Sequence, residues 1–415
     1  MVDRIMEMEH NQRSETTALA RIVAPISTEV FFDEYFEAQP LLVARNDADH
    51  FAGLLSLEHV DRIIATLDLR WPDISLINAA RKIEPDEYIR QGDVVDVAQI
   101  FSLHADGATI ILNHLHTLHS PLADFCAALE LEFSCPIQSN VYVTPPDAKG
   151  FKAHFDTHDV FILQVHGSKR WRLYGTPIEL PTRGQGDEAS QDSPCAPTKE
   201  FVLNSGDTLY IPRGLVHDAM SCNDTSVHVT VGVLSYTWTD ALLEALAAVC
   251  LNDPTFRRSL PRGLARGDYD YEPARKMFQS FIERFALSVD PQAALKTFVD
   301  NFIESRRPRL LGQMMHLSAL KTLSLLDVVA LRSHLAYSVR EDDAGIHVCI
   351  YGKEIRFPNS ASAALRYALA KRRFKIADLP NNLDDESKLV FVRRLVREGV
   401  LAVVGAEPQS APAIT

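Results

Sequence analysis

Cysteine is scarce in this sequence, and the cysteines that are present form no pair of the kind that holds zinc. The 415 residues include six cysteines, which are scattered along the chain without any C-x-x-C spacing. A zinc ribbon needs such pairs, and a disulfide framework needs a denser set of cysteines in a small secreted domain. We therefore expect reduced, mostly buried thiols in a cytoplasmic protein.

Long apolar runs are also missing. No stretch approaches the roughly 18 apolar residues that suggest a membrane-spanning helix. The first twenty residues, MVDRIMEMEHNQRSETTALA, are polar and acidic and lack the apolar centre of a secretory signal peptide. Hydrophobic residues make up 46% of the chain and charged residues 23%, as is usual for globular proteins. We therefore expect no membrane partner and a chain long enough for two or three domains.

The net charge is acidic but unevenly distributed. A total of −13 argues against wholesale nucleic-acid binding, because phosphates are attracted to basic surfaces. Residues 320–405 alone carry +4, which leaves −17 on the remainder of the chain. An acidic body favours basic partners through long-range electrostatic steering.

The spacing of apolar residues divides the chain into five parts. After residue 136 the apolar period becomes two, with Gly and Pro between the runs, which predicts the short strands of a β-barrel or sandwich. Farther on, helical spacing predicts a bundle or dimerisation region. The zone after it is expected to hold one helix, a short β pair around IHVCIYGKEIRFP, two helices and a final strand, GVLAVV, which together outline a winged helix. The expected parts are a flexible segment (1–26), a catalytic-type domain (27–238), a helical region (239–320), a winged-helix-like domain (321–405) and a disordered tail (406–415).

Two half-motifs in the second part suggest a metal site. His154 and Asp156 are separated by one residue, and on a strand that spacing places both side chains on one face. His217 lies 63 residues further on, at the end of GDTLYIPRGLVH, which fits G-x5-P-x-G-x-x-H, the second half-motif of a cupin barrel. Two imidazoles and one carboxylate leave coordination positions open, as in non-haem Fe(II) oxygenases. The alternative is a surface histidine at a strand end, which the presence of both halves makes a poorer explanation.

The stretch SNVYVTPPDAKGFKAHFDTHDVFILQVHGSKRWRLYG resembles the cupin-4, JmjC-type ribosomal oxygenases, which are Fe(II)- and 2-oxoglutarate-dependent protein hydroxylases. FFDEYFEAQPLLV is similar to a motif near the N-terminus of that family. The resemblance implies an α+β protein. It would consist of a JmjC/cupin double-stranded β-helix (jelly-roll) barrel, a helical dimerisation region and a C-terminal winged-helix domain. A homodimer is implied as well.

The same resemblance implies roles for individual residues. His154, Asp156 and His217 would ligate the iron and form the catalytic centre. Lys169 stands where the family has the basic residue that pairs with the distal carboxylate of 2-oxoglutarate, and a buried dicarboxylate does need a charge-assisted partner. Arg170 is the alternative cation, in which case Lys169 would be a surface turn residue.

Two further polar residues match positions that contact the co-substrate in the family. Asn140 and Thr230 each alternate with valines, so both can face a barrel interior, as can His228. A satisfied polar residue of the core is the alternative reading for all three. Five other histidines lack a carboxylate or turn partner and are assigned no metal: His114, His116, His119, His158 and His166.

The function implied by the resemblance is hydroxylation of a side chain, an arginine or histidine of a ribosomal protein, with Fe(II), 2-oxoglutarate and molecular oxygen. The same chemistry on a peptide natural-product precursor or on a methylated lysine is an alternative. A non-catalytic cupin binding module is another, although a binder has no need of open coordination positions. A nucleic-acid-binding regulator could use the basic stretches LAKRRFK and KLVFVRRLVREG, but such runs are more often solvated helix faces.

Overall fold

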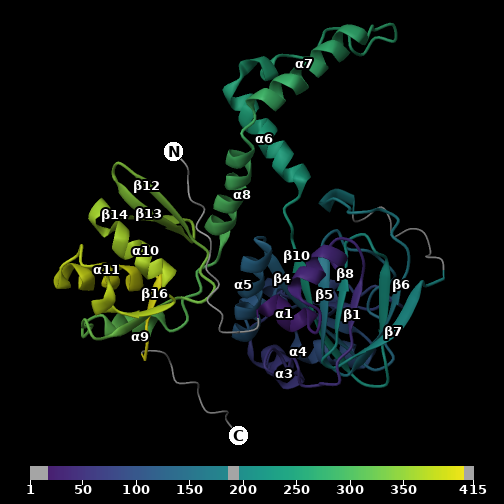
Figure 1. The fold of residues 1–415 in the computed structure, drawn as a ribbon. Helices are drawn as coiled ribbons and strands as arrows, with labels where there is room; N and C mark the ends of the chain where they lie inside the picture. Colours follow the sequence, from purple (N-terminus) through teal and green to yellow (C-terminus); the bar gives the residue numbers. More distant parts are fainter. Residues whose placement is uncertain (1–16, 186–195, 406–415) are drawn as a thin grey trace. The chain divides into compact units, whose positions relative to one another are not determined.

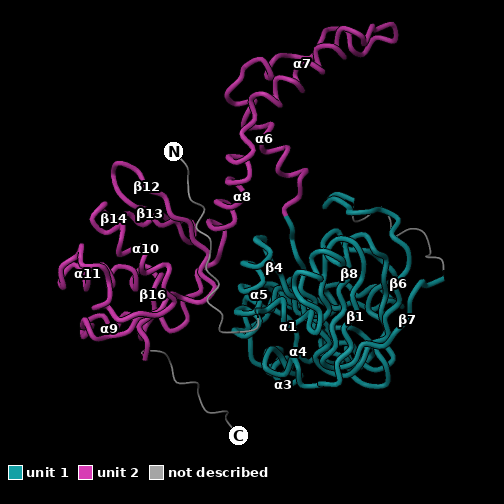
Figure 2. Tube along the Cα trace, in the orientation of Figure 1, with its two compact units in different colours: residues 1–235 teal, residues 236–415 magenta. Residues whose placement is uncertain are grey.

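The computed structural model describes residues 17–185 and 196–405. The chain forms two compact units that divide after Ser235, and each is described by itself (Figure 2). The predicted disorder of residues 406–415 falls outside the described residues, as does the predicted flexibility of residues 1–16. Of the helices that the structure describes, none has the length and apolar character needed to cross a membrane.

Unit 1 is built on two antiparallel sheets (Figure 1). The larger has seven strands in the order β1-β8-β5-β10-β4-β3-β2. These are β1 (Leu41–Val43), β2 (Ile74–Ile77), β3 (Thr109–Leu112), β4 (Ile137–Thr144), β5 (Asp159–His166), β8 (Thr208–Ile211) and β10 (Ser226–Val233). The smaller has the order β7-β6-β9, with β6 (Ser168–Leu173), β7 (Lys199–Asn204) and β9 (His217–Ser221). Apolar side chains of β5 and β8 pack with those of β6 and β7, so the sheets form a sandwich, as the two-residue period predicted.

Helices flank the larger sheet: α1 (Ala18–Val23), α2 (Thr28–Val30) with a π-helical turn (Phe31–Tyr35), α3 (Leu57–Thr66), α4 (Val97–Ala105) and α5 (Ser120–Phe133). Ser27 and Ser56 cap α2 and α3 by accepting a backbone N–H. The predicted flexibility of residues 1–26 is wrong for its described end. Leu19, Ile22 and Val23 recur at helical spacing and are buried, which holds α1 against unit 1.

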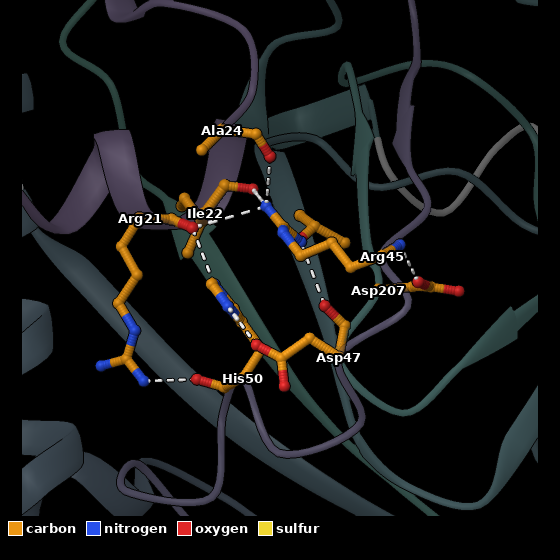
Figure 3. Close-up of polar contacts among 9 residues, drawn as sticks. Arg21, Ile22, Ala24, Arg45, Asp47, His50 and Asp207 are labelled. Carbon is orange, nitrogen blue, oxygen red and sulfur yellow. Dashed lines mark hydrogen bonds and ion pairs between the residues drawn. The ribbon is translucent and has the colours of Figure 1, made fainter.

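Arg45, in the loop after β1, ties α1 to the larger sheet (Figure 3). Its guanidinium donates to the carbonyls of Ile22 and Ala24 at 2.7 and 2.9 Å, and to Thr208 Oγ1 at 2.8 Å. Its backbone N–H donates to Asp207 Oδ1 at 2.6 Å. Carbonyls at the end of a helix have no partner within it, so the cation both satisfies them and opposes the helix dipole.

Arg45→Ala is therefore expected to lower the free energy of unfolding by about 3 kcal/mol, because several carbonyls lose their donor at once. Urea denaturation followed by circular dichroism measures the change. Arg62→Ala, at an exposed position of α3, serves as the control and should change stability by less than about 0.5 kcal/mol. Equal effects of the two substitutions would contradict the assigned role of Arg45.

Unit 2 begins with four helices, in agreement with the helical spacing of residues 239–320: α6 (Trp238–Asn252), α7 (Glu272–Ser288), α8 (Pro291–Ser305) and α9 (Gln313–Ala319). Two three-stranded sheets and two helices follow: β12 (Ser338–Asp342), β13 (Gly345–Ile350) and β14 (Lys353–Phe357); β11 (Val328–Leu331), β15 (Arg373–Lys375) and β16 (Leu401–Val403); α10 (Ser362–Ala370) and α11 (Asp385–Arg397).

The β content of unit 2 is larger than the sequence suggested. We expected one β pair and a final strand, whereas β11 and β15 also pair, and they join β16 in a second sheet. The helix expected at the start of 321–405 is absent there, since α9 ends at Ala319 and no described helix lies between it and β11. Strands of three or four residues are too short to display a two-residue period, which is why they escaped notice.

Candidate metal centre

His154, Asp156 and His217 converge in unit 1. Each offers one ligand atom, and these atoms all lie within 4.8 Å of one another. His217 Nε2 is 3.7 Å from Asp156 Oδ2, and the two imidazole centroids are 4.7 Å apart. Within residues 17–185 and 196–405, no other group of three His, Cys, Asp or Glu side chains could hold a metal ion. The structure thus brings the two half-motifs together.

The backbone around these ligands differs from the prediction. His154 and Asp156 do not lie on a strand but in the irregular segment before β5. His154 is instead joined to His217 by an isolated bridge, in which each backbone N–H donates to the other's carbonyl at 3.1 and 2.8 Å. The carbonyl of Asp156 accepts the N–H of Gly214 at 2.9 Å. Convergence of the ligands therefore depends on contacts between the two segments and not on strand alternation.

Both histidines are oriented by a second hydrogen bond. Nδ1 of His154 is 2.8 Å from the carbonyl of Lys152, and Nδ1 of His217 is 3.0 Å from the carbonyl of Leu215. Because a carbonyl only accepts, Nδ1 carries the hydrogen and Nε2 of the neutral ring keeps a free lone pair. Burial, followed by the neighbouring charge of His154, lowers the pKa of His217 and favours that neutral form.

Lys169 lies inside the sandwich. It is on β6, only 4% exposed, and its Nζ donates to Thr144 Oγ1 at 3.0 Å. Burial lowers the pKa of Lys169 to about 7. Arg170, the alternative cation, is exposed and pairs with Glu200 at 2.9 Å. Of the two cations, Lys169 is the one available to an interior ligand.

Buried polar atoms without partners surround this lysine. Nδ1 of His228 and Nε1 of Trp171 are buried, and neither has a hydrogen-bond partner among the described residues. Their rings lie edge to face, with centroids 5.8 Å apart, and His228 stacks on Tyr142 at 4.8 Å. Burial, and then the charge of Lys169, lowers the pKa of His228 well below its usual range. An unsatisfied buried polar group costs about 1–3 kcal/mol, so such a concentration indicates a place for a polar ligand.

Asn140 and Thr230 are direct neighbours across β4 and β10. Thr230 is two positions from His228 and Asn140 two positions from Tyr142, so all four share one sheet face. Oδ1 of Asn140 accepts the N–H of His114 at 3.0 Å. Both residues are partly buried, and they extend the polar row that includes His228.

Sequence reasoning missed the placement of two aromatic residues. Trp171 packs in the apolar core of unit 1, and it also shares the face of β6 that carries Lys169, a relation that the two-residue period could have revealed. Tyr142 lies near the metal ligands: burial and then the charge of Asp156 raise the pKa of its hydroxyl to about 12.

Of the histidines that were assigned no metal, His116 accepts the N–H of Ser139 at 3.2 Å.

The model of the JmjC domain matches residues 112–241, a span that includes every residue of this centre. Proteins called bifunctional lysine-specific demethylase and histidyl-hydroxylase NO66 are similar in sequence. The one from Drosophila mojavensis is 28% identical over 304 residues, which is 69% of this chain and 34% of that protein. The one from Drosophila sechellia is 31% identical over 247 residues, 59% of this chain and 38% of that protein. The chain thus spans little more than a third of these relatives' length.

The fold is also similar to a solved structure, that of YcfD, a ribosomal oxygenase from Escherichia coli, in complex with cobalt and succinic acid. The TM-score is 0.52 at 18% sequence identity, and the match covers 92% of this chain and 99% of that one. The similarity at this identity shows a shared fold that extends over both units.

Proposed function

We propose that this chain, which belongs to the JmjC-type ribosomal oxygenase family, is an Fe(II)- and 2-oxoglutarate-dependent oxygenase that hydroxylates a side chain of a protein. The observation that carries the proposal is the cluster of His154, Asp156 and His217, with Nε2 of both imidazoles free. Two imidazoles and one carboxylate suit iron and leave coordination positions for a co-substrate and oxygen.

The residues present fit both groups. His154 and His217, through Nε2, and Asp156, through its carboxylate, would hold the iron. Bound together, iron, 2-oxoglutarate and oxygen supply the oxidising chemistry, which no amino-acid side chain provides. Lys169 would hold the distal carboxylate of 2-oxoglutarate, with Thr144 beside it.

The remaining interior residues support the same ligand. His228 and Trp171 carry buried polar atoms without partners, which a carboxylate could satisfy. We assign Asn140 and Thr230 to the wall along the co-substrate, because they lie on the same face as His228. The packed rings of Tyr142, Trp171 and His228 keep water away from this interior, which strengthens the charge pairing of Lys169.

For the substrate we propose an arginine or histidine of a basic ribosomal protein. The names of the relatives include a histidyl-hydroxylase and a ribosomal oxygenase, and residues outside 320–405 carry a net charge of −17, which favours a basic partner. The relatives' name also includes a lysine-specific demethylase, so methyl-lysine is the second candidate. We place the protein in the cytoplasm, since its six cysteines are scattered along the sequence without any C-x-x-C spacing, a pattern typical of reduced thiols.

The Fe(II)-loaded chain, given 2-oxoglutarate and peptides from basic ribosomal proteins, is expected to form succinate and to add one oxygen atom to one peptide. Mass spectrometry of the peptides identifies the residue, and His217→Ala, which lacks a ligand, should give neither product. Loss of a methyl group from methyl-lysine peptides would instead support demethylation. No succinate under any condition would contradict the enzyme assignment.

We also infer the finer architecture of the two units. The two sheets of unit 1 are assigned to the jelly-roll barrel of the JmjC fold, and residues 321–405 to a winged-helix-like domain. We further infer that α6 and α7 mediate homodimerisation. Both helices expose large apolar side chains that are each more than half accessible: Trp238, Leu242, Leu243, Leu251, Met277, Phe278, Ile282 and Leu287. Apolar surface on this scale marks an interaction site.

Replacing Phe278 and Ile282 with glutamate is accordingly expected to convert a dimer into a monomer, because a charge buried in an apolar interface has no partner. Sedimentation equilibrium measures the mass. Gln279→Glu, an exposed polar position on the same helix, is the matched control and should leave the dimer intact. A monomeric unmodified chain at all concentrations would contradict the inference.

A further inference from the structure

Two buried residues that are not metal ligands connect the two half-motifs. Asp159 is the first residue of β5, three residues after Asp156, and Arg213 lies four residues before His217. Asp159 is 0% exposed and Arg213 is 9% exposed. Nη1 of Arg213 donates to Asp159 Oδ2 at 2.6 Å, so an ion pair joins the chain segments that carry the ligands.

The ion pair belongs to a closed ring of hydrogen bonds. The hydroxyl of Tyr210 donates to Asp159 Oδ1 at 2.7 Å, and Nη1 of Arg213 also reaches Glu37 Oε1 at 2.7 Å. The backbone N–H of Glu37 donates to the hydroxyl of Tyr210 at 2.8 Å. Glu37 comes from the FFDEYFEAQPLLV motif. A buried ion pair is tolerated when further hydrogen bonds satisfy its polar atoms, and here both carboxylate oxygens of Asp159 accept a hydrogen bond.

The backbone beside this ring is fixed as well. The N–H of Gly214 donates to the carbonyl of Asp156 at 2.9 Å. Gly214 has a φ of +89°, and a Cβ at this position would lie 2.2 Å from the carbonyl oxygen of Ile178. Gly214 thus lets the turn that leads into His217 pack closely against the chain at Ile178, and its N–H bonds the turn to the segment that carries Asp156. The Asp159–Arg213 ion pair joins the same turn and the same segment at a second point.

We propose that the Asp159–Arg213 ion pair is a positioning device that sets Asp156 and His217 at metal-binding separation, an inference that rests on the proposed metal centre. Neither residue touches the metal. Asp159 acts through the backbone that leads back to Asp156, and Arg213 through the backbone that leads on to His217. A displacement of either segment would move its ligand atom out of reach of the metal. Partners of this kind around metal ligands typically change metal affinity about 10- to 100-fold when they are removed.

A ring of this kind could also do no more than stabilise the fold, and a matched variant separates the two roles. Asp207 is likewise a buried carboxylate of unit 1, 2% exposed, and its two oxygens accept the N–H groups of Arg45 and Asn204 at 2.6 and 2.9 Å. It belongs to the network of Figure 3, and the hydrogen bonds given for its carboxylate join it to Arg45 and Asn204, neither of which is a candidate metal ligand. Asp159→Asn and Asp207→Asn therefore each remove one negative charge from a similarly buried position. Only Asp159→Asn changes a member of the ring.

The test is titration of the full chain and of both variants with Co(II) alone, followed by the d–d absorption of the metal, together with the melting temperature of each metal-free protein. We expect Asp159→Asn to bind Co(II) about 10- to 100-fold more weakly, with an altered band shape. Asp207→Asn should match the unmodified chain despite a comparable loss of melting temperature.

Unchanged affinity and spectrum in Asp159→Asn would overturn the positioning role and leave the metal centre intact. Failure of the unmodified chain to bind Co(II) would overturn the metal centre itself, so the two failures are distinguishable. If Asp159→Asn does not fold, Glu37→Gln replaces it, because Glu37 is partly exposed and its substitution weakens only one arm of the ring. An unchanged Co(II) spectrum in that variant would count against the proposal.

Discussion

Lys169→Met is expected to weaken binding of 2-oxoglutarate at least about 100-fold and, at the same time, to raise the stability of the metal-free chain. The ammonium is buried and has one neutral partner, Thr144, so it is held ready for an anion at a cost to folding. Methionine has a similar length and fills the space without the desolvation penalty. Affinity for 2-oxoglutarate falls because the bound co-substrate needs the charged ammonium. Stability of the metal-free chain rises because, without a ligand, burying that ammonium is a cost.

The stability gain should depend on pH in a defined direction. Burial lowers the pKa of Lys169 to about 7, whereas an unfolded lysine titrates near 10.4. Between these values the unfolded chain binds one more proton, so the stability of the unmodified protein rises with pH across this window. The advantage of Lys169→Met is therefore largest at or below about pH 7 and shrinks toward about pH 10.

In the unmodified chain, the affinity for 2-oxoglutarate should fall as the pH rises, whereas the stability of the chain rises over the same window. Below about pH 7 the ammonium is already charged, and above it binding must bring in a proton, so affinity falls as the pH rises. Calorimetry with 2-oxoglutarate in buffers of different ionisation enthalpy measures this uptake. Arg170→Met, at the exposed neighbour, is the control and should alter neither quantity. Equal losses of affinity in the two variants would remove Lys169 from the co-substrate site.

Asp156→Asn is expected to lower the affinity for divalent metal by more than about 100-fold. This loss is larger than the one expected for Asp159→Asn, because Asp156 is itself a proposed ligand. An amide oxygen carries no charge to balance the metal, and two neutral imidazoles alone are a weak site. Activity should disappear with the metal. Titration with Co(II) or Mn(II), followed by spectroscopy, measures the affinity directly.

A second aspartate provides the matched comparison. Asp218 is buried next to His217 in the sequence, but its carboxylate is bonded to Lys149 at 2.5 Å and to the hydroxyl of Tyr174 at 3.2 Å. Asp218→Asn should therefore cost stability and spare metal binding. If Asp218→Asn lost as much affinity as Asp156→Asn, the carboxylate ligand would be wrongly assigned.

Much of unit 1 could be predicted because its signals are local. The two-residue period marks β4, β5, β6 and β10. The three candidate ligands could also be chosen from the spacing in the two half-motifs, and the structure brings their side chains together. These features depend on neighbours within a few residues, which is the range over which a sequence pattern carries information.

The remaining features depend on pairings between distant residues. The bridge between His154 and His217 replaces the strand that spacing predicted, and no local pattern encodes it. The partner of Asp159 lies 54 residues away, so its burial as part of an ion pair could not be inferred. In unit 2, β15 pairs with β11, and β11 pairs with β16 as well, and these pairings are decided by tertiary packing.

Because His154 and His217 exchange backbone hydrogen bonds, the position of each ligand is set across space by the segment of the other, and the length of the connection between them along the sequence matters less. The entropy of closing a loop grows slowly, by about 0.6 kcal/mol for each doubling of its length. This connection can therefore be lengthened at little thermodynamic cost. We expect that the chain could even be severed there, with the two fragments still assembling one complete metal centre.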